Sequence, residues 1–274
     1  MDHVGFVDGA VALLLLKLGL TPALIGLATI VSRRWGPAVG GLLVALPLTS
    51  GPVLFFLALD NGPVFAARAS EGSLAGTVAV GGFCLTYAWA GRRLAWWAAF
   101  GLACGAYAVV SGVMQPVVAG PVVALLLVAL ATPIVGLVLL PPVGGALSAA
   151  AVAPAWDLPA RMVLGTALVI GITAAATGLG PLLSGLLATF PVVVTVLAVF
   201  THRREGPSRT VLMLRGVLTG MFGTIAFFVV LRLTLEPYGI AVAFPAGVAL
   251  ALTIQAAGLR WLRRGGAGVG PSAR

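Results

Sequence analysis

Residues 36–83 of this chain repeat at residues 180–227, without a gap and at a constant offset of 144 positions. Thirteen of the 48 paired positions are identical, whereas roughly five matches are expected by chance in a chain so rich in leucine, alanine, glycine and valine. Eight of the thirteen pairs are glycine or proline: Gly36/Gly180, Pro37/Pro181, Gly41/Gly185, Pro47/Pro191, Gly62/Gly206, Pro63/Pro207, Gly72/Gly216 and Gly76/Gly220. Because these residues set backbone geometry, the repeat indicates a preserved pattern of bends and close contacts.

The composition is that of a membrane protein. Of the 274 residues, 60% are hydrophobic and 8% are charged, and the mean hydropathy is +1.13, which is more apolar surface than a water-soluble domain can bury. A spanning helix needs about 20 apolar residues. We therefore predict an all-α, polytopic membrane protein with nine transmembrane helices, at residues 10–32, 37–59, 72–91, 94–114, 117–140, 160–179, 181–201, 208–232 and 238–262.

The offset of 144 also organises these predicted helices. It pairs the first four with the last four and leaves the helix at 117–140 without a partner. We expect a first repeat at 1–114, a connector at 115–158, a second repeat at 159–264 and a flexible tail at 265–274. An odd connecting helix turns the second repeat over in the bilayer, giving a 4 + 1 + 4 inverted repeat, and two inverted halves that exchange conformations are the basis of alternating access.

The basic residues predict the orientation of the chain. The formal charge is +9, but the arginines lie at predicted helix ends, so we expect no nucleic-acid partner. With the N-terminus outside, thirteen of the sixteen lysines and arginines fall on the cytoplasmic side, and only Lys17, Arg68 and Arg232 fall outside.

No basic segment of a cleavable signal opens the chain, so we expect the first helix to be retained. Fifteen arginines against one lysine suggest a GC-rich bacterial genome, and hence an inner membrane.

Two of the predicted helices carry a proline near the middle of the span, Pro47 and its repeat partner Pro191. Proline removes a backbone hydrogen bond and clashes with the preceding turn. Broken backbone at bilayer depth is tolerated where it is buried in protein or lines a wet cavity. Packing alone is the alternative interpretation of such kinks. The predicted substrate-binding residues are those of the two breaks: Pro47, Thr49, Ser50, Gly51, Pro52, Pro191 and Thr195.

Few charged residues accompany these breaks. Lys17 lies inside the first predicted helix and aligns with Arg161. Lys17 either attracts an anionic substrate or extends its amine to the membrane interface, and we interpret Arg161 as a cation that extends to that interface. We interpret four charged residues at helix ends as ion pairs or gates: Asp60, Glu71, Glu205 and Arg215. No carboxylate or histidine falls at mid-depth, so the sequence does not support proton coupling through a buried carboxylate.

Signatures of enzymes, metal sites and cofactors are missing from the sequence. The two histidines are His3 and His202, and the two cysteines, Cys84 and Cys104, lack metal-ligand spacing. We therefore expect no enzymatic activity, no metal and no cofactor. The expected partners are the lipid bilayer and a small-molecule solute, and a homo-oligomer is left open.

The segments Gly41-Leu42-Leu43-Val-Ala-Leu-Pro47 and Gly185-Leu186-Leu187-Ala-Thr-Phe-Pro191 each resemble a Gly-Leu-x-x-x-x-Pro stretch of the GlpM-type small four-helix bacterial inner-membrane proteins. The resemblance covers roughly 90 residues of each half, as though two such units had fused. That family is associated with exopolysaccharide production. The inverted pairing more distantly resembles the drug/metabolite transporter architecture, which has five helices in each half instead of four plus a connector.

Two functions follow as hypotheses. The first is a secondary transporter that moves a small neutral or anionic organic solute along the broken helices. The second is a non-transporting membrane scaffold or accessory subunit for envelope polysaccharide synthesis, as the resemblance to GlpM-type proteins implies.

Reporter fusions test the predicted orientation. Fusions placed after Arg34, Arg93 and Arg204 should all report the cytoplasm, because arginine-rich loops are retained on that side. Alkaline phosphatase and green fluorescent protein fusions give opposite signals on the two sides. Phosphatase activity at any of the three positions would contradict the nine-helix topology.

Overall fold

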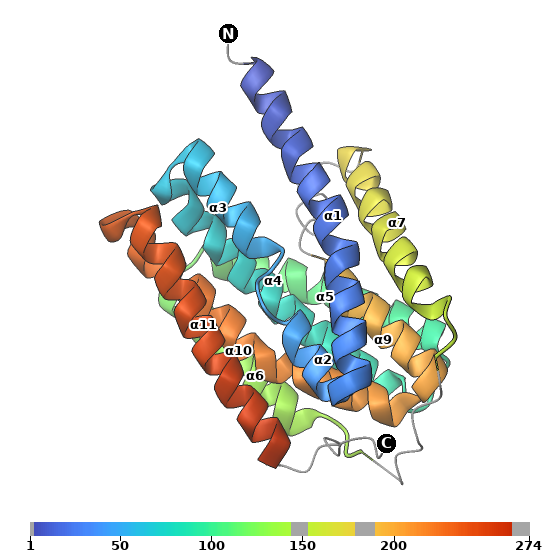
Figure 1. The fold of residues 1–274 in the computed structure, drawn as a ribbon. Coiled ribbons are helices and arrows are strands. Elements are labelled where there is room, and N and C mark those ends of the chain that lie inside the picture. The colour runs from blue at the N-terminus through green and yellow to red at the C-terminus, as the bar shows by residue number, and fades with distance from the viewer. Residues whose placement is uncertain (1–2, 144–152, 179–189, 265–274) are drawn as a thin grey trace.

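The computed structural model describes residues 3–143, 153–178 and 190–264, without the side chains of residues 3–18, 173 and 175–178. All regular structure in these ranges is helical, and the predicted tail at 265–274 lies outside them. The helices, drawn in Figure 1, are α1 (His3–Trp35), α2 (Pro37–Val44), α3 (Ser50–Asn61), α4 (Pro63–Ala90), α5 (Trp96–Val118), α6 (Val122–Leu139), α7 (Asp157–Gly178), α9 (Val192–Glu205), α10 (Pro207–Tyr238) and α11 (Ile240–Arg264).

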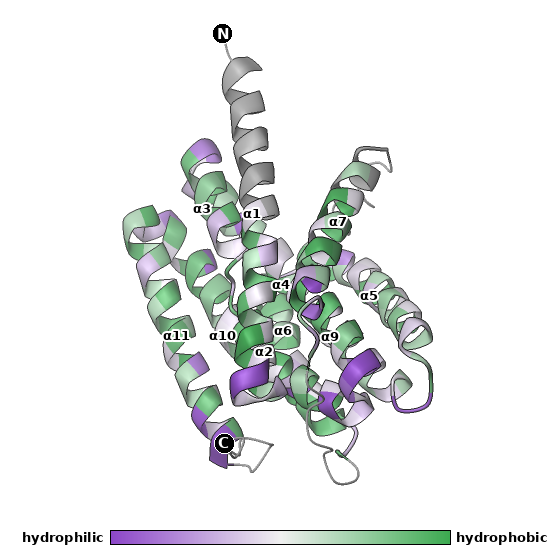
Figure 2. Cartoon of the chain, turned by 45° about the vertical axis from the view of Figure 1, so that its right-hand side comes forward, coloured by the Kyte–Doolittle hydropathy of each residue, from purple (hydrophilic) through white to green (hydrophobic). Residues whose placement is uncertain are grey.

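Among the described residues, five helices, α4, α5, α6, α10 and α11, are long and apolar enough to cross a membrane. This confirms the prediction of an all-helical, multi-pass membrane protein. The predicted span at 37–59 is divided into α2 and α3, and the spans at 10–32, 160–179 and 181–201 include residues that are not fully described. The count of nine spans therefore stays a prediction. Figure 2 shows hydrophobic residues along the helices and the hydrophilic ones gathered mainly at helix ends.

An antiparallel pair, α4 and α10, forms the centre of the fold. Glu71, near the start of α4, makes an ion pair with Arg232, near the end of α10. At the other end, Tyr87 of α4 lies 3.4 Å from His202, which shortly precedes α10. Helix α6 packs against both helices, since a Cβ added to its Gly136 would lie 2.9 Å from the Leu218 side chain of α10.

Helix α2 packs directly on the backbone of α10. A Cβ added to Gly41 would overlap the carbonyl oxygen of Met213, and one added to Gly216 would overlap the carbonyl oxygen of Ala38. A Cβ on Gly220 would lie 2.9 Å from the Leu42 carbonyl oxygen. Small residues allow such close approach of helices within a membrane. The close contact expected at Gly41 is present, whereas its repeat partner Gly185 lies outside the described residues.

The outer helices pack around the central pair of α4 and α10. Helix α5 packs on α4, α11 packs on α10, and α1 runs beside α2, α7 and α9. Ile25 of α1 fits over Gly165 of α7, close to Val196 of α9. The junction of α1, α7 and α9 is therefore packed by side chains from all three helices.

Two of the repeated glycines form matching turns. Gly62 has φ 86° and ψ 165°, and Gly206 has φ 84° and ψ 176°. Side chains disfavour this left-handed region, so glycine is the residue suited to it. Each glycine is followed by a proline, Pro63 or Pro207, at the first position of the next helix, where its fixed φ is favourable.

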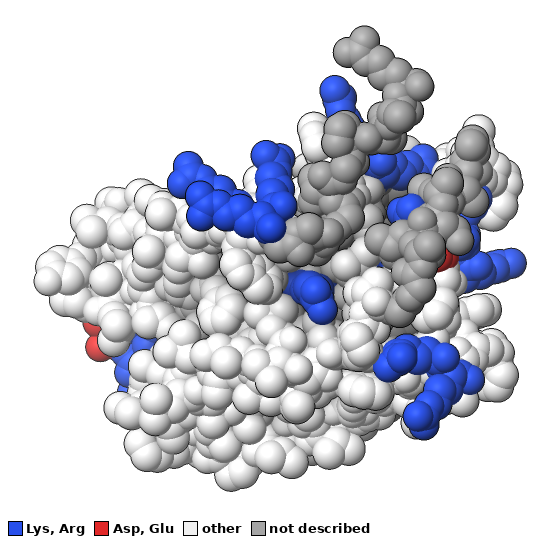
Figure 3. All heavy atoms as spheres, turned by 90° about the horizontal axis from the view of Figure 1, so that it is seen from below, with Lys and Arg blue, Asp and Glu red and all other residues white. Residues whose placement is uncertain are grey.

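Arginines and tryptophans gather at one end of the bundle, which we call the basic end. It comprises the last turns of α1, α4, α9 and α11 and the first turns of α5, α7 and α10. Figure 3 looks onto this end and shows several groups of basic side chains with few acidic ones. All six tryptophans lie here and are exposed: Trp35, Trp89, Trp96, Trp97, Trp156 and Trp261. Tryptophan is enriched where helices pass the lipid headgroups, so the basic end marks one membrane interface.

Substituting Gly41 by alanine should destabilise the fold. Its added methyl group would meet the Met213 carbonyl oxygen, so the two helices must separate, at a cost of roughly 1–3 kcal/mol. Gly105→Ala on α5 is the matched control, because a Cβ there meets nothing within 4 Å. Thermal unfolding in detergent measures both, and an unchanged melting temperature for Gly41→Ala would contradict the close contact.

Candidate functional site

The predicted interruption of the second helix is present. Helix α2 ends at Val44 and α3 begins at Ser50, with residues 45–49 non-helical. Pro47 has no N–H, so the Leu43 carbonyl oxygen instead accepts a hydrogen bond of 3.1 Å from the Leu46 N–H. The Gly51 N–H then donates to the Pro47 carbonyl oxygen at 2.8 Å and starts α3.

A side chain of α10 contacts this broken segment, and a side chain of α11 lies close by. The Thr224 hydroxyl donates a hydrogen bond to the Ala45 carbonyl oxygen, within the break. Gln255 of α11 donates from Nε2 to the Gly220 carbonyl oxygen at 3.0 Å. Its Oε1 is buried and has no hydrogen-bond partner among the described residues. The break is thus held by the opposite half of the chain and carries one unsatisfied acceptor beside it.

The predicted residues of the break differ in their surroundings. Thr49 is exposed, and Pro47, Ser50 and Pro52 are half-buried. Gly51 is buried, and a Cβ there would lie 3.5 Å from the ring of Phe227. The side chain of Lys17 lies outside the described residues.

The second predicted break lies partly outside the described residues, at 181–189. In the described part, Phe190 and Pro191 are non-helical and α9 begins at Val192. Thr195 is only 4% exposed, and its hydroxyl has no partner among the described residues. Thr29 of α1 has the same property, and α1 packs on α9. An unsatisfied buried polar group costs roughly 1–3 kcal/mol, so these two hydroxyls are positions where a bound polar group would be stabilised.

Two mainly apolar cavities lie on the bundle. One, of about 340 Å³, lies between α1, α2 and α11 and includes Leu46 of the break. The other, of about 580 Å³, lies between α3 and α11 and includes Phe55 and Phe244. Among the predicted substrate-binding residues whose side chains the structure describes, none lines either cavity.

At the basic end, a buried carboxylate binds three arginines. Asp157, the first residue of α7, is fully buried and lies 2.5 Å from Arg33 of α1, 2.8 Å from Arg161 of α7 and 3.0 Å from Arg204 of α9. Arg161 is itself 4% exposed and stacks over the ring of Phe200, 4.9 Å from its centroid. The cluster joins three helices and carries two positive charges in excess of its one carboxylate.

This arrangement keeps Asp157 ionised. Burial alone would raise the pKa of Asp157. The attraction of Arg161 and the hydrogen bonds from Arg161, Arg33 and Arg204 outweigh burial, so the pKa lies below its usual value. The stabilisation from these contacts is therefore complete at neutral pH and is lost as the pH falls through the lowered pKa.

The structure corrects the interpretation of Arg161 as an interfacial cation. Its side chain turns into the bundle and pairs with Asp157 instead of extending to the membrane surface. Sequence reasoning missed Asp157. The available signal was its spacing of four residues before Arg161 at the start of a helix, where such pairs face each other.

The four charged residues predicted as ion pairs or gates divide into two groups. Glu71 pairs with Arg232 at the end opposite the basic one, and Arg232 also lies 3.5 Å from Glu236. Glu205 lies 3.4 Å from Arg209. Asp60 and Arg215 form no ion pair within the described part of the chain.

Within the described ranges, no three histidine, cysteine, aspartate or glutamate side chains lie close enough together to hold a metal ion. His202 is half-buried at the basic end, and burial lowers its pKa, so the ring that faces Tyr87 is neutral at neutral pH.

Replacing Asp157 by asparagine should destabilise the protein by about 3 kcal/mol, because the buried Arg161 then lacks its counter-charge. The control is Asp60→Asn, which removes an exposed carboxylate and should change stability by less than about 0.5 kcal/mol. Unfolding in detergent, followed by circular dichroism, measures the difference. Equal stability of the two variants would show that the cluster does not join the helices.

Comparison with protein-family models, curated proteins and solved structures gave no match. The functional interpretation therefore depends on the residues and geometry described above.

Proposed function

We propose that this chain is a secondary transporter-like protein of a bacterial inner membrane, which moves a small neutral or anionic organic solute by alternating access. The observation that carries the proposal is the break at residues 45–49, together with the non-helical residues 190–191 that precede α9 at the equivalent position of the repeat. A matched pair of interrupted helices is the best pointer to a transporter binding site.

The helix boundaries support a repeat at the offset of 144. Helices α3 and α9 end at Asn61 and Glu205, α4 and α10 begin at Pro63 and Pro207, and α5 and α11 begin at Trp96 and Ile240. Each of these three pairs differs by 144 positions.

The buried faces of paired helices support the same relation. Three residues buried on α5, at positions 99, 103 and 107, correspond to three buried on α11, at positions 243, 247 and 251. Because α4 and α10 are antiparallel, the equivalent turns at Gly62 and Gly206 lie at opposite ends of the bundle. This is the arrangement expected of an inverted repeat, and it favours the 4 + 1 + 4 organisation.

In the proposed mechanism, the two ionic networks act as gates. The Asp157 cluster ties α1, α7 and α9 together at the basic end, and the Glu71–Arg232 pair ties α4 to α10 at the other. Opening one network while the other stays closed gives alternating access to the broken segments. The basic end faces the cytoplasm in this proposal, with the C-terminus inside and the N-terminus outside.

The alternative is a non-transporting scaffold or accessory subunit for envelope polysaccharide synthesis. One observation favours it: protein donors already occupy the Ala45 and Gly220 carbonyl oxygens, and the two described cavities have apolar walls. A scaffold packs its middle with protein groups, whereas a transporter exposes polar groups there during its cycle.

Flux measurements separate the two functions. Thr49→Val and Ser50→Ala keep side-chain volume but remove a hydroxyl, and the loss of one hydrogen bond to a solute should slow uptake about fivefold. Thr253→Val is the control, because Thr253 is exposed on α11 and bonds only its own helix backbone, at 2.8 Å from the Ala249 carbonyl oxygen. Uptake of neutral and singly anionic solutes into proteoliposomes gives the readout, and Lys17→Gln should reduce uptake of the anionic solutes alone.

Two results would contradict the proposal. One is the absence of uptake of every solute by the unsubstituted protein, which favours the scaffold. The other is uptake that none of these substitutions changes, which places the pathway away from the break in α2. Melting temperatures close to that of the unsubstituted protein exclude misfolding as the cause of lost uptake.

A further inference from the structure

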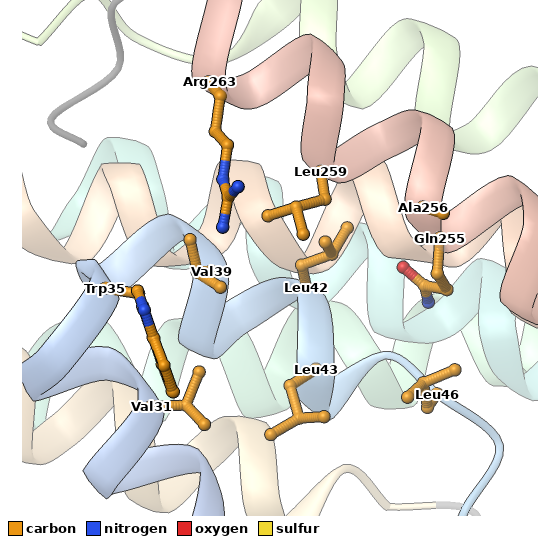
Figure 4. A pocket seen from close by; sticks show the side chains of 10 residues that line it. All are labelled: Val31, Trp35, Val39, Leu42, Leu43, Leu46, Gln255, Ala256, Leu259 and Arg263. Carbon is orange, nitrogen blue, oxygen red and sulfur yellow. The ribbon is translucent and has the colours of Figure 1, made fainter.

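The cavity between α1, α2 and α11 has the shape and chemistry of a lipid site at the basic end. Its volume is about 340 Å³. A single water needs about 10–15 Å³ of such volume, so the cavity has room for a much larger group, such as part of one acyl chain. Figure 4 shows its wall, which is formed mainly by aliphatic side chains: Val31, Val39, Leu42, Leu43, Leu46 and Leu259.

The cavity has one charged end and one deep polar end, both on α11. Arg263 and Gln255 line it eight residues apart, which corresponds to about 12 Å along a helix. Half of a bilayer's hydrocarbon core is about 15 Å thick. The cavity therefore reaches from the headgroup level, marked by Trp35 and Trp261, most of the way through one leaflet.

Gln255 lines the deep end of the cavity. Its side chain is 7% exposed and is held by the bond from Nε2 to the Gly220 carbonyl oxygen. Figure 4 shows the oxygen end of this amide turned toward Leu42. The Gln255 amide, which lies near the break that follows α2, limits how deeply an acyl chain enters the cavity.

The charged end favours an anion. Arg263 forms no ion pair in the described part of the chain, and its side chain points into the cavity mouth in Figure 4. Arg33, by contrast, is bound to Asp157. Arg264 follows in the same turn of α11, and both arginines are exposed. A basic mouth at the headgroup level above an apolar cavity complements an anionic phospholipid.

The cavity is open at the surface of the bundle. Two of the residues that line it are exposed, Trp35 of α1 at 43% and Ala256 of α11. A lipid acyl chain can therefore enter the cavity sideways, directly from the bilayer. We propose that this cavity binds one anionic phospholipid of the adjacent leaflet, with its phosphate at Arg263 and one acyl chain between α2 and α11. This site does not depend on whether the protein transports a solute.

The test uses the full-length protein, purified in detergent and supplied with equal amounts of phosphatidylglycerol and phosphatidylcholine of identical chains. Native mass spectrometry then counts the lipids retained by each protein molecule. We expect one tightly retained phosphatidylglycerol, preferred about fivefold over phosphatidylcholine, which is the contribution of one arginine near a membrane surface. Arg263→Gln should remove that preference, whereas Arg203→Gln, an exposed arginine of the basic end outside the cavity, should keep it.

A second pair of variants tests whether the lipid acyl chain occupies the cavity. Ala256 and Ala257 are both exposed, and only Ala256 lines the cavity. Ala256→Phe should fill the cavity and abolish retention, and Ala257→Phe should leave it intact. Retention unchanged by Ala256→Phe, equal retention of the two lipids, or no retained lipid would each overturn the proposal. If Ala256→Phe fails to fold, the comparison of Arg263→Gln with Arg203→Gln still decides it.

Discussion

The fold depends on the direct contact between the backbones of α2 and α10. Gly41 and Gly216 allow this contact because any larger side chain would overlap a carbonyl oxygen of the partner helix. Without a strong hydrophobic drive between helices in lipid, such van der Waals contact is a main source of association. It places an eight-residue helix of the first half on the longest spanning helix of the second. The break after α2 is then within reach of Thr224, which donates to the Ala45 carbonyl oxygen, a group that the lipid could not satisfy. Gln255 donates to the Gly220 carbonyl oxygen of α10 nearby.

The ion pairs at the two ends of the molecule differ in how strongly they hold the helices together. At the basic end, one buried carboxylate connects three helices through three arginines. At the opposite end, Arg232 connects α4 to α10 through Glu71, in partly exposed surroundings. Buried charges cost several kcal/mol when one partner is removed, whereas exposed pairs contribute about 1 kcal/mol or less. Separating the helices at the basic end is therefore the more costly of the two movements.

Local features of the fold were predictable from the sequence. The predicted span at 37–59 begins with α2 at Pro37, and Pro47 interrupts it, because proline acts on its own backbone. The start of α4 at Pro63 was missed, since that span was predicted to begin at residue 72. The Asp157 cluster was not predictable in full. Only its pair with Arg161 is local, and Arg33 and Arg204 come from helices whose proximity depends on the tertiary fold. The partner of Glu71 was missed for the same reason, since Arg232 lies 161 residues further along the chain.

The tryptophans at the basic end also bear on how the protein responds to the thickness of its membrane. Indole rings hold their depth at the headgroup level, so this end keeps its position relative to its own leaflet. None of the six tryptophans in the sequence lies at the opposite end, which holds Tyr238 instead. When the bilayer thins or thickens, the mismatch is accommodated mainly at that second end. The Glu71–Arg232 pair lies there, so its exposure to water changes with lipid chain length while the Asp157 cluster keeps its surroundings.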